Sequence, residues 1–197
     1  QIYSKQKPLF LIIKKGYKFF QKFIFYFFLS LFKINFFFLP RNKIIFYAIS
    51  KNNYDSLEPV YINLNKRSLF LSSDYRLSNN TFLFPLIIPI MMSFIFIPSL
   101  IINIIKENTI NKKRYLLFLN DILLSMGFKS FINFYLKLLR PKAIVFANDH
   151  SFYARMLIKA AEKMNIPCFY IQHSAVTDIF PKVISKDALL EGKDSLI

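Results

Sequence analysis

Both histidines of this chain lie just beyond runs that have the composition of buried strands. His150 comes after residues 143–147, and His173 comes after residues 168–172. A neutral imidazole can take a proton from a hydroxyl group near pH 7, so a histidine at a strand end is a candidate general base. The residues around the two histidines are polar or titratable: Asn148, Asp149, Ser151, Gln172 and Ser174.

The elements that position these residues have the pattern of a strand, a helix and a second, parallel strand. Residues 143–147 are continuously apolar, as in a strand buried on both faces. Residues 151–164 have an amphipathic helical pattern, and residues 168–172 form the next apolar run. This length suits a right-handed βαβ unit of about 30 residues. A third strand is expected at residues 188–190, after a loop that passes over the same edge of the sheet.

Parallel strands end at the same edge of their sheet, and open α/β sheets bind ligands there. We therefore predict that His173, Asp149 and His150 are catalytic. His173 would act as a general base or contact phosphate groups of a ligand, and Asp149 would orient a histidine or share the base role. Asp149 or Ser151 is expected to cap the helix. The predicted substrate-binding residues are Asn148, Ser151, Arg155, Gln172 and Ser174.

Two of these assignments have alternatives that the residues leave open. The alternative for His150 is that it has no catalytic role and merely helps to cap the helix that follows it. Arg155, one turn into that helix, can reach an anionic ligand at the helix N-terminus. It can equally be a solvent-facing partner of Lys159 and Glu162.

The N-terminal segment carries much of the net charge of +16, which attracts phosphate groups. Over residues 9–39, Phe, Leu and Ile surround an arc of lysines in a helical pattern. The longest uncharged run there, residues 23–32, is shorter than the ~20 residues that a membrane span needs. We predict a helix that lies in the interface of an anionic membrane. The alternative is a helix packed on its own domain with a solvated lysine face.

Residues 77–105 carry no charge and are long enough to cross a membrane. Prolines interrupt this segment, and a span would separate the strands predicted at 43–50 and 67–74 from the later strands. Interfacial, re-entrant or core helices are therefore expected, and a span stays an open alternative. Residues 112–140 are expected to be helical, with their apolar pattern broken near Gly127.

These patterns predict an α/β protein with a Rossmann-like parallel sheet and an N-terminal amphipathic helical segment. The expected domains are a basic membrane-associating helix over residues 1–40 and a Rossmann-like domain over residues 41–197.

Composition excludes several classes of site. Glycine occurs 3 times, so a glycine-rich phosphate loop is excluded. The one cysteine, Cys168, excludes a disulfide framework and a thiolate metal site, and we interpret it as an apolar strand residue. No metal and no cofactor are expected. Nucleic acid is not an expected partner, because no recognition motif is present and the basic residues are interleaved with membrane-like apolar stretches.

A family resemblance rests on IVFANDHSFYARMLIKAAEKMNIPCFYIQHSAVTDIFP, followed by DALLEG. This segment resembles the end of the N-terminal domain of bacterial GT-B-fold glycosyltransferases that make capsule and lipopolysaccharide, a group that includes CDP-glycerol glycerophosphotransferase-like enzymes. The similarity covers residues 140–197 well and 43–75 loosely. Ser174 stands where many members have glycine.

The resemblance implies an acceptor-side domain, the N-terminal half of a GT-B fold, cut off before the nucleotide-binding domain and inactive alone. The donor would be a nucleotide-sugar or CDP-polyol, and the acceptor a cell-surface glycan or a lipid-linked glycan. The expected location is the cytoplasmic face of the plasma membrane.

Two other functions stay open at the level of sequence. One is a sugar-nucleotide epimerase-like enzyme. The other is a non-catalytic, membrane-bound assembly protein with a degenerate Rossmann-like domain. Replacement of His173 distinguishes these classes, because an enzyme would lose turnover with its fold intact.

Overall fold

The computed structural model describes residues 8–32, 40–77, 81–171 and 187–189, and the chain divides into two compact units. The helical unit comprises residues 1–32 and 86–131, and the sheet unit comprises residues 33–85 and 132–197. Residues 86–131 thus group with the N-terminal helix, whereas the division expected from sequence assigned them to the domain that contains the sheet.

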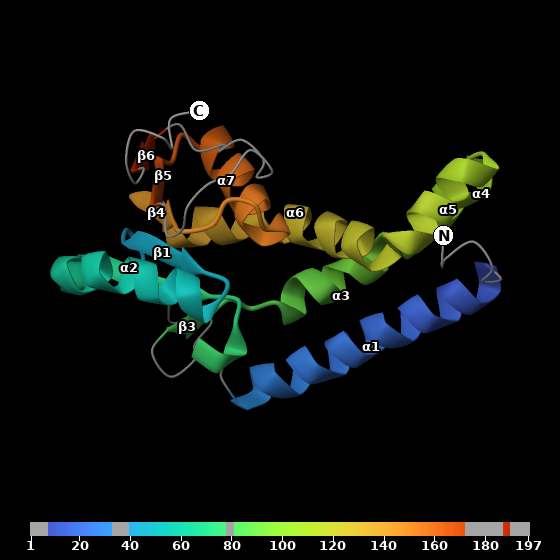
Figure 1. Ribbon diagram of the computed structural model, residues 1–197, viewed down its shortest axis with the longest axis horizontal. Coiled ribbons are helices and arrows are strands. Elements are labelled where there is room, and N and C mark those ends of the chain that lie inside the picture. The colour runs from blue at the N-terminus through green and yellow to red at the C-terminus, as the bar shows by residue number, and fades with distance from the viewer. Residues whose placement is uncertain (1–7, 33–39, 78–80, 172–186, 190–197) are drawn as a thin grey trace. The chain divides into compact units, whose positions relative to one another are not determined.

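The sheet unit is built on parallel strands, which confirms the α/β class predicted from sequence. Every neighbouring pair is parallel, and the strand order β3-β2-β1-β4-β5-β6 is that of a Rossmann-type sheet (Figure 1). The strands predicted near residues 145, 170 and 189 are neighbours in the predicted order. The strands are β1 (Ile44–Ala48), β2 (Ser68–Ser72), β3 (Phe82–Leu83), β4 (Ala143–Phe146), β5 (Cys168–Ile171) and β6 (Asp187–Leu189).

Helices connect these strands, as crossovers between parallel strands require. Helix α2 (Lys51–Leu64) joins β1 to β2, and α7 (Phe152–Lys163) joins β4 to β5. The last part of α6 (Leu119–Leu139) leads into β4. Two short 3₁₀ helices, η2 (Asn65–Arg67) and η3 (Tyr75–Leu77), lie on either side of β2.

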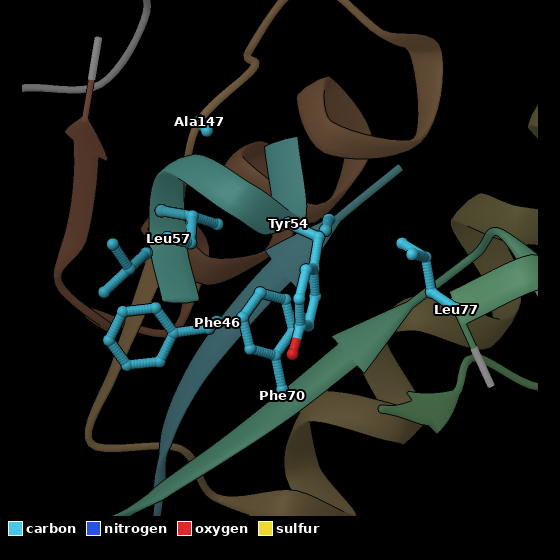
Figure 2. Packing of buried hydrophobic residues seen from close by; sticks show 8 residues of the cluster. Phe46, Tyr54, Leu57, Phe70, Leu77 and Ala147 are labelled. Atoms are coloured by element: carbon cyan, nitrogen blue, oxygen red, sulfur yellow. The ribbon is translucent and has the colours of Figure 1, made fainter. Parts of the chain in front are cut away.

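One face of the sheet packs against α2 through aromatic rings. Phe46 of β1 and Phe70 of β2 are fully buried, and their ring centroids are 6.0 Å apart. Tyr54 of α2 lies over Phe70 with a centroid distance of 4.7 Å. Figure 2 shows these three rings together, with Leu57 beside them. Apolar burial of this kind supplies the main driving force for holding α2 on the sheet.

The opposite face packs against α6. Alternate strand residues point to opposite sides, so Tyr47 and Phe146 face away from α2. Their rings contact each other at 6.1 Å, and Tyr47 also contacts Phe84 at 6.4 Å. Phe84 in turn meets Tyr135 of α6 at 5.1 Å. Both faces of the central strands are therefore covered, which explains why their sequences are continuously apolar.

The helical unit contains α1 (Pro8–Phe32), α3 (Ile87–Ile95), α4 (Ile97–Lys106), α5 (Thr109–Leu117) and the first part of α6. The helix predicted over residues 9–39 is confirmed as far as Phe32, and residues 33–39 lie outside the described residues. Phe19 of α1 is buried with Ile90 and Leu100. Its ring meets Phe94 of α3 edge to face at 5.4 Å.

The uncharged segment 77–105 does not form one straight helix. Helices α3 and α4 are bent by 53° to each other, and Pro98 lies in the first turn of α4, where a missing amide hydrogen costs least. Taken together, the two helices have the length and the apolar composition of a broken membrane span or a re-entrant loop. Among the described helices, α6 alone is long and apolar enough to cross a membrane, and half of its most apolar window is buried within the protein.

Helix α6 runs without a break through Gly127, although the apolar pattern of the sequence is interrupted there. The break between helices lies instead at Phe118, between α5 and α6. A Cβ atom at Gly127 would lie 2.9 Å from the backbone nitrogen of Ser93 and closer still to the carbonyl oxygen of Pro89. The glycine therefore marks a close approach of α6 to α3.

Candidate functional site

The loops at the carboxyl edge of the sheet begin with polar residues. Ser50 follows β1, Asp74 follows β2 and Asn148 follows β4. Strand β1 lies between β2 and β4. The chain first adds β2 and β3 on one side of β1 and later adds β4, β5 and β6 on the other side. Such a switch in strand order opens a crevice between the two loops, and ligands of open α/β sheets bind there. The loops after β1 and β4 therefore form the walls of the candidate site.

The loop after β4 is fixed by its own side chains. Asn148 Oδ1 accepts hydrogen bonds from the backbone N–H groups of His150 at 2.9 Å and Ser151 at 3.0 Å. Ser151 Oγ accepts from the N–H of Ala154 at 3.1 Å and is the N-cap of α7. Of the two predicted caps, Ser151 is therefore the one used. Asn148 and Ser151 thus accept hydrogen bonds from the backbone around the start of α7.

Asp149 and His150 form the titratable pair of this site. Asp149 is fully buried, and its Oδ1 lies 3.0 Å from Nδ1 of His150. The side chain of His150 is 20% exposed, so the ring connects the buried carboxyl group with the surface. The pair also affects Tyr170 of β5. Burial, and then the negative charge of Asp149, raise the pKa of the Tyr170 phenol.

Arg155 lies in the second turn of α7 and is half-buried. Its Nε is shielded from solvent and has no hydrogen-bond acceptor among the residues that the structure describes. A guanidinium nitrogen removed from water without an acceptor is unfavourable, so this position suits contact with an anion. The geometry is compatible with the anion-binding role predicted for Arg155.

The structure thus brings together Asn148, Asp149, His150 and Ser151 on one loop, with Arg155 on the helix that follows. Gln172, His173 and Ser174 lie outside the described residues, so their part in the site stays a prediction. The expectation that both histidines lie at one edge of the sheet therefore also stays a prediction.

Sequence reasoning missed the wall of the site that follows β1. Ser50 caps α2 by accepting a hydrogen bond from the N–H of Asn53 at 3.4 Å, and Asn53 is buried. Tyr54 Oη donates to Glu58 Oε1 at 2.5 Å in the same helix. A sequence pattern could have predicted this loop, because AISKNN has the same order of apolar strand and polar loop as VFANDHS.

A second polar arrangement follows β2. Arg76 donates to both carboxylate oxygens of Asp74, with Nε at 2.9 Å and 3.1 Å and an Nη at 2.6 Å. These hydrogen bonds outweigh the effect of burial and lower the pKa of Asp74. Since Arg76 satisfies the carboxylate, we interpret this pair as a structural support of the carboxyl edge.

A cavity of about 540 Å³ opens at the opposite, amino edge of the sheet. Its walls include Lys137 and Arg140 near the end of α6, Lys142 before β4 and Met164 after α7. None of the sequence-predicted site residues lines it. The cavity and the Asp149–His150 pair are therefore two separate features of the sheet unit.

No group of three potential metal ligands occurs within the part of the chain that the structure describes. Comparison of the chain with protein-family models, with curated proteins and with solved structures finds no match. The likeness to GT-B glycosyltransferases stays a prediction from the sequence.

Proposed function

We propose that this chain is the acceptor-side α/β domain of a transferase that moves a nucleotide-activated sugar or polyol phosphate onto a hydroxyl group. The observation that carries the proposal is the 3.0 Å contact between the buried Asp149 carboxyl group and Nδ1 of His150. This pair stands at the carboxyl edge, in the loop after β4, the strand next to the switch in strand order.

The chemistry follows from the two nitrogens of the His150 ring. Asp149 Oδ1 lies 3.0 Å from Nδ1, and in the proposed mechanism the neutral ring carries its proton on Nδ1, which leaves Nε2 free to accept one. Nε2 takes the proton of the acceptor hydroxyl as its oxygen attacks the activated carbon or phosphorus of the donor. The nucleotide leaves with the electron pair of the broken bond. The negative charge of Asp149 stabilises the imidazolium that forms.

The remaining residues of the site bind rather than transfer protons. Arg155 contacts a phosphate or another anionic group of the substrate through its guanidinium group. The side-chain amide of Asn148 and the hydroxyl hydrogen of Ser151 can donate to substrate oxygens, since their oxygens are engaged as acceptors. For His173, which lies outside the described residues, the role predicted from sequence is a second base or a contact to the donor phosphates.

Attachment to an anionic membrane surface is part of the proposal, and the helical unit supports it. Helix α1 exposes large apolar side chains, including Tyr17, Phe20 and Phe28, beside exposed Lys18 and Lys22. Helices α1, α3 and α4 contain no acidic residue. Apolar exposure next to cationic side chains suits the interface of an anionic bilayer. Attachment that persists unchanged in neutral vesicles at any salt would count against this part.

The catalytic part is tested by transfer assays with the full-length protein. Uridine diphosphate sugars, CDP-glycerol and CDP-ribitol serve as donors and lipid-linked glycans as acceptors, and release of the nucleotide is followed. His150→Gln should lower kcat by about 10²- to 10⁴-fold, the range of general base catalysis, with an unchanged unfolding midpoint. Asp149→Asn should also lower kcat, because it removes the charge that stabilises the imidazolium.

The matched control is Lys159→Gln, an exposed position of the same helix, which should leave kcat unchanged. A His150→Gln variant as fast as the wild type contradicts the proposed base. A wild-type protein that turns over none of the donors contradicts the transferase and favours the non-catalytic assembly role.

A further inference from the structure

We infer that the sheet unit has a second ligand site, at the amino edge of the sheet, for a phosphate group that carries an apolar chain. The site is the cavity of about 540 Å³ between the C-terminal ends of α6 and α7. It lies at the opposite edge from the Asp149–His150 pair and does not depend on the proposed transfer reaction.

The charged side chains of this cavity all have the same sign. Lys137, Arg140 and Lys142 line it, all three are exposed, and no acidic residue lines it. Cations near helix C-termini also complement the helix dipoles. The positive charge that the dipoles offset must therefore be subtracted from the charge available to a ligand. Each helix end carries about −0.5 charge, so the ends of α6 and α7 account for about one of the three positive charges. About two positive charges remain for a ligand.

The backbone N–H groups of the cavity are already satisfied, so the available donors for an anion are the side chains of the three basic residues and the amide of Asn165. The N–H of Arg140 donates to the carbonyl of Leu136 at 2.8 Å, and that of Asn165 donates to Glu162 at 3.1 Å. The N–H of Lys142 donates to Lys43 at 3.0 Å. Arg140 and Asn165 both have positive φ angles, 47° and 54°, which end the two helices sharply and fix the walls of the cavity.

The surrounding edge extends the positive potential. Arg41 and Lys43 precede β1, and Lys66 and Arg67 precede β2, all at the amino edge. The acidic side chains Asp74 and Asp149 lie after β2 and β4, at the carboxyl edge. Asp187, which begins β6, is an acidic residue at this edge, so the basic residues are in excess rather than alone. An excess of basic residues raises the local concentration of anions and their rate of encounter.

The rest of the lining is apolar, which distinguishes the ligand from a bare phosphate ion. Leu136 and Met164, with Ile166 and two prolines, form this part of the wall. Apolar atoms of the ligand would remove this surface from water. The shared chemistry is therefore a phosphate ester with an apolar chain, and its source is either a membrane lipid headgroup or a free phosphorylated compound.

The test uses the methyl group of Met164 as a local probe. In protein labelled with ¹³C-methyl methionine, the Met164 resonance is assigned by Met164→Leu and followed by NMR. Dioctanoyl phosphatidic acid, below its micelle concentration, should shift this resonance in a saturable way. Dioctanoyl phosphatidylcholine should bind at least 10-fold more weakly, on the order of the effect of one net charge. Raising the salt from 0.05 M to 0.5 M should weaken binding, because the charges are screened.

The triple variant K137Q/R140Q/K142Q should weaken binding roughly 30-fold, about 3-fold for each exposed charge. The single variant Lys142→Gln should weaken it about 3-fold, and it keeps the test valid if the triple variant is unstable. Lys159→Gln on α7 and Lys18→Gln on α1 are the matched controls, and both should bind as the wild type does.

The arms of the experiment also identify the source of the phosphate. Inorganic phosphate should bind much more weakly than phosphatidic acid, and similar affinity for the two would overturn the inference of an apolar chain. Tighter binding of phosphatidic acid than of a soluble short-chain alkyl phosphate supports the lipid headgroup, whereas similar affinity for these two supports a free phosphorylated compound. No saturable shift at Met164 would overturn the inference. So would wild-type binding by the triple variant, or loss of binding in Lys18→Gln. Transfer activity does not enter the measurement, so its outcome is independent of the proposed reaction.

Discussion

Replacement of Gly127 by alanine tests the close packing of α6 on α3. The added methyl group would meet the carbonyl oxygen of Pro89 and the backbone nitrogen of Ser93, the latter at 2.9 Å. It would also meet Ser93 Oγ, which donates to the Pro89 carbonyl at 2.7 Å. Two of the three obstacles are backbone atoms, so a change of side-chain rotamer cannot relieve the overlap. The two helices must move apart.

The magnitude follows from three opposing contributions. Alanine is favoured over glycine in a helix by ~1 kcal/mol. Overpacking typically costs ~1–3 kcal/mol, and loss of the Ser93 hydrogen bond costs about another 1 kcal/mol. We expect Gly127→Ala to destabilise the helical unit by about 1–3 kcal/mol in total. Gly16 of α1 is the matched control, because a Cβ atom there would meet nothing within 4 Å. Gly16→Ala should stabilise the unit by up to ~1 kcal/mol.

Urea unfolding followed by circular dichroism measures both variants, with free energies of unfolding from linear extrapolation. Hydrogen exchange of the α3 amides shows whether the change is local to the packed helices. If Gly127→Ala were as stable as the wild type while Gly16→Ala gained stability, the close approach of α6 and α3 would be wrong.

Three further predictions concern the sheet unit. Ser151→Ala removes the N-cap of α7 and should lower the free energy of unfolding by about 1 kcal/mol in urea titrations, and an unchanged value would contradict the cap. Burial raises the pKa of the Cys168 thiol to about 12, so a disulfide reagent at pH 8 should label the native protein far more slowly than the protein in urea; equal rates would disprove the burial. Hydrogen bonds from Arg76 lower the pKa of Asp74, so the stability they contribute is present above the ordinary Asp pKa of about 3.9 and is lost as pH falls through the lower, folded value. Arg76→Gln should therefore lose less stability than the wild type between pH 5 and pH 2, and equal losses would contradict the pairing.

The sheet could be predicted from sequence because local patterns determine it. Residues 143–147 and 168–172 are apolar runs flanked by a capped amphipathic helix, and parallel pairing follows from the right-handed crossover. The same reasoning placed Asn148, Asp149 and His150 at the carboxyl edge. These inferences depend on neighbours within about 30 residues, where the sequence pattern is strongest.

Features that depend on distant parts of the chain could not be predicted. The position of β1 between β2 and β4 creates the switch point, yet no local pattern states which strands pair. Gly127 looks like a break in a helix until α3 is seen against it. The basic cavity joins Lys137 on α6 with Met164 after α7, and its positive residues resemble ordinary helix-end charges in the sequence.

The function of the Asp149–His150 pair depends on which ring nitrogen carries the proton. Nitrogen-15 chemical shifts of the His150 imidazole, assigned with His150→Gln, report this directly. We predict that the neutral ring is protonated on Nδ1, 3.0 Å from Asp149 Oδ1, and that Nε2 is unprotonated. Asp149→Asn should abolish that preference. A neutral His150 protonated on Nε2 would leave no base facing the acceptor and would contradict the proposed role of the pair.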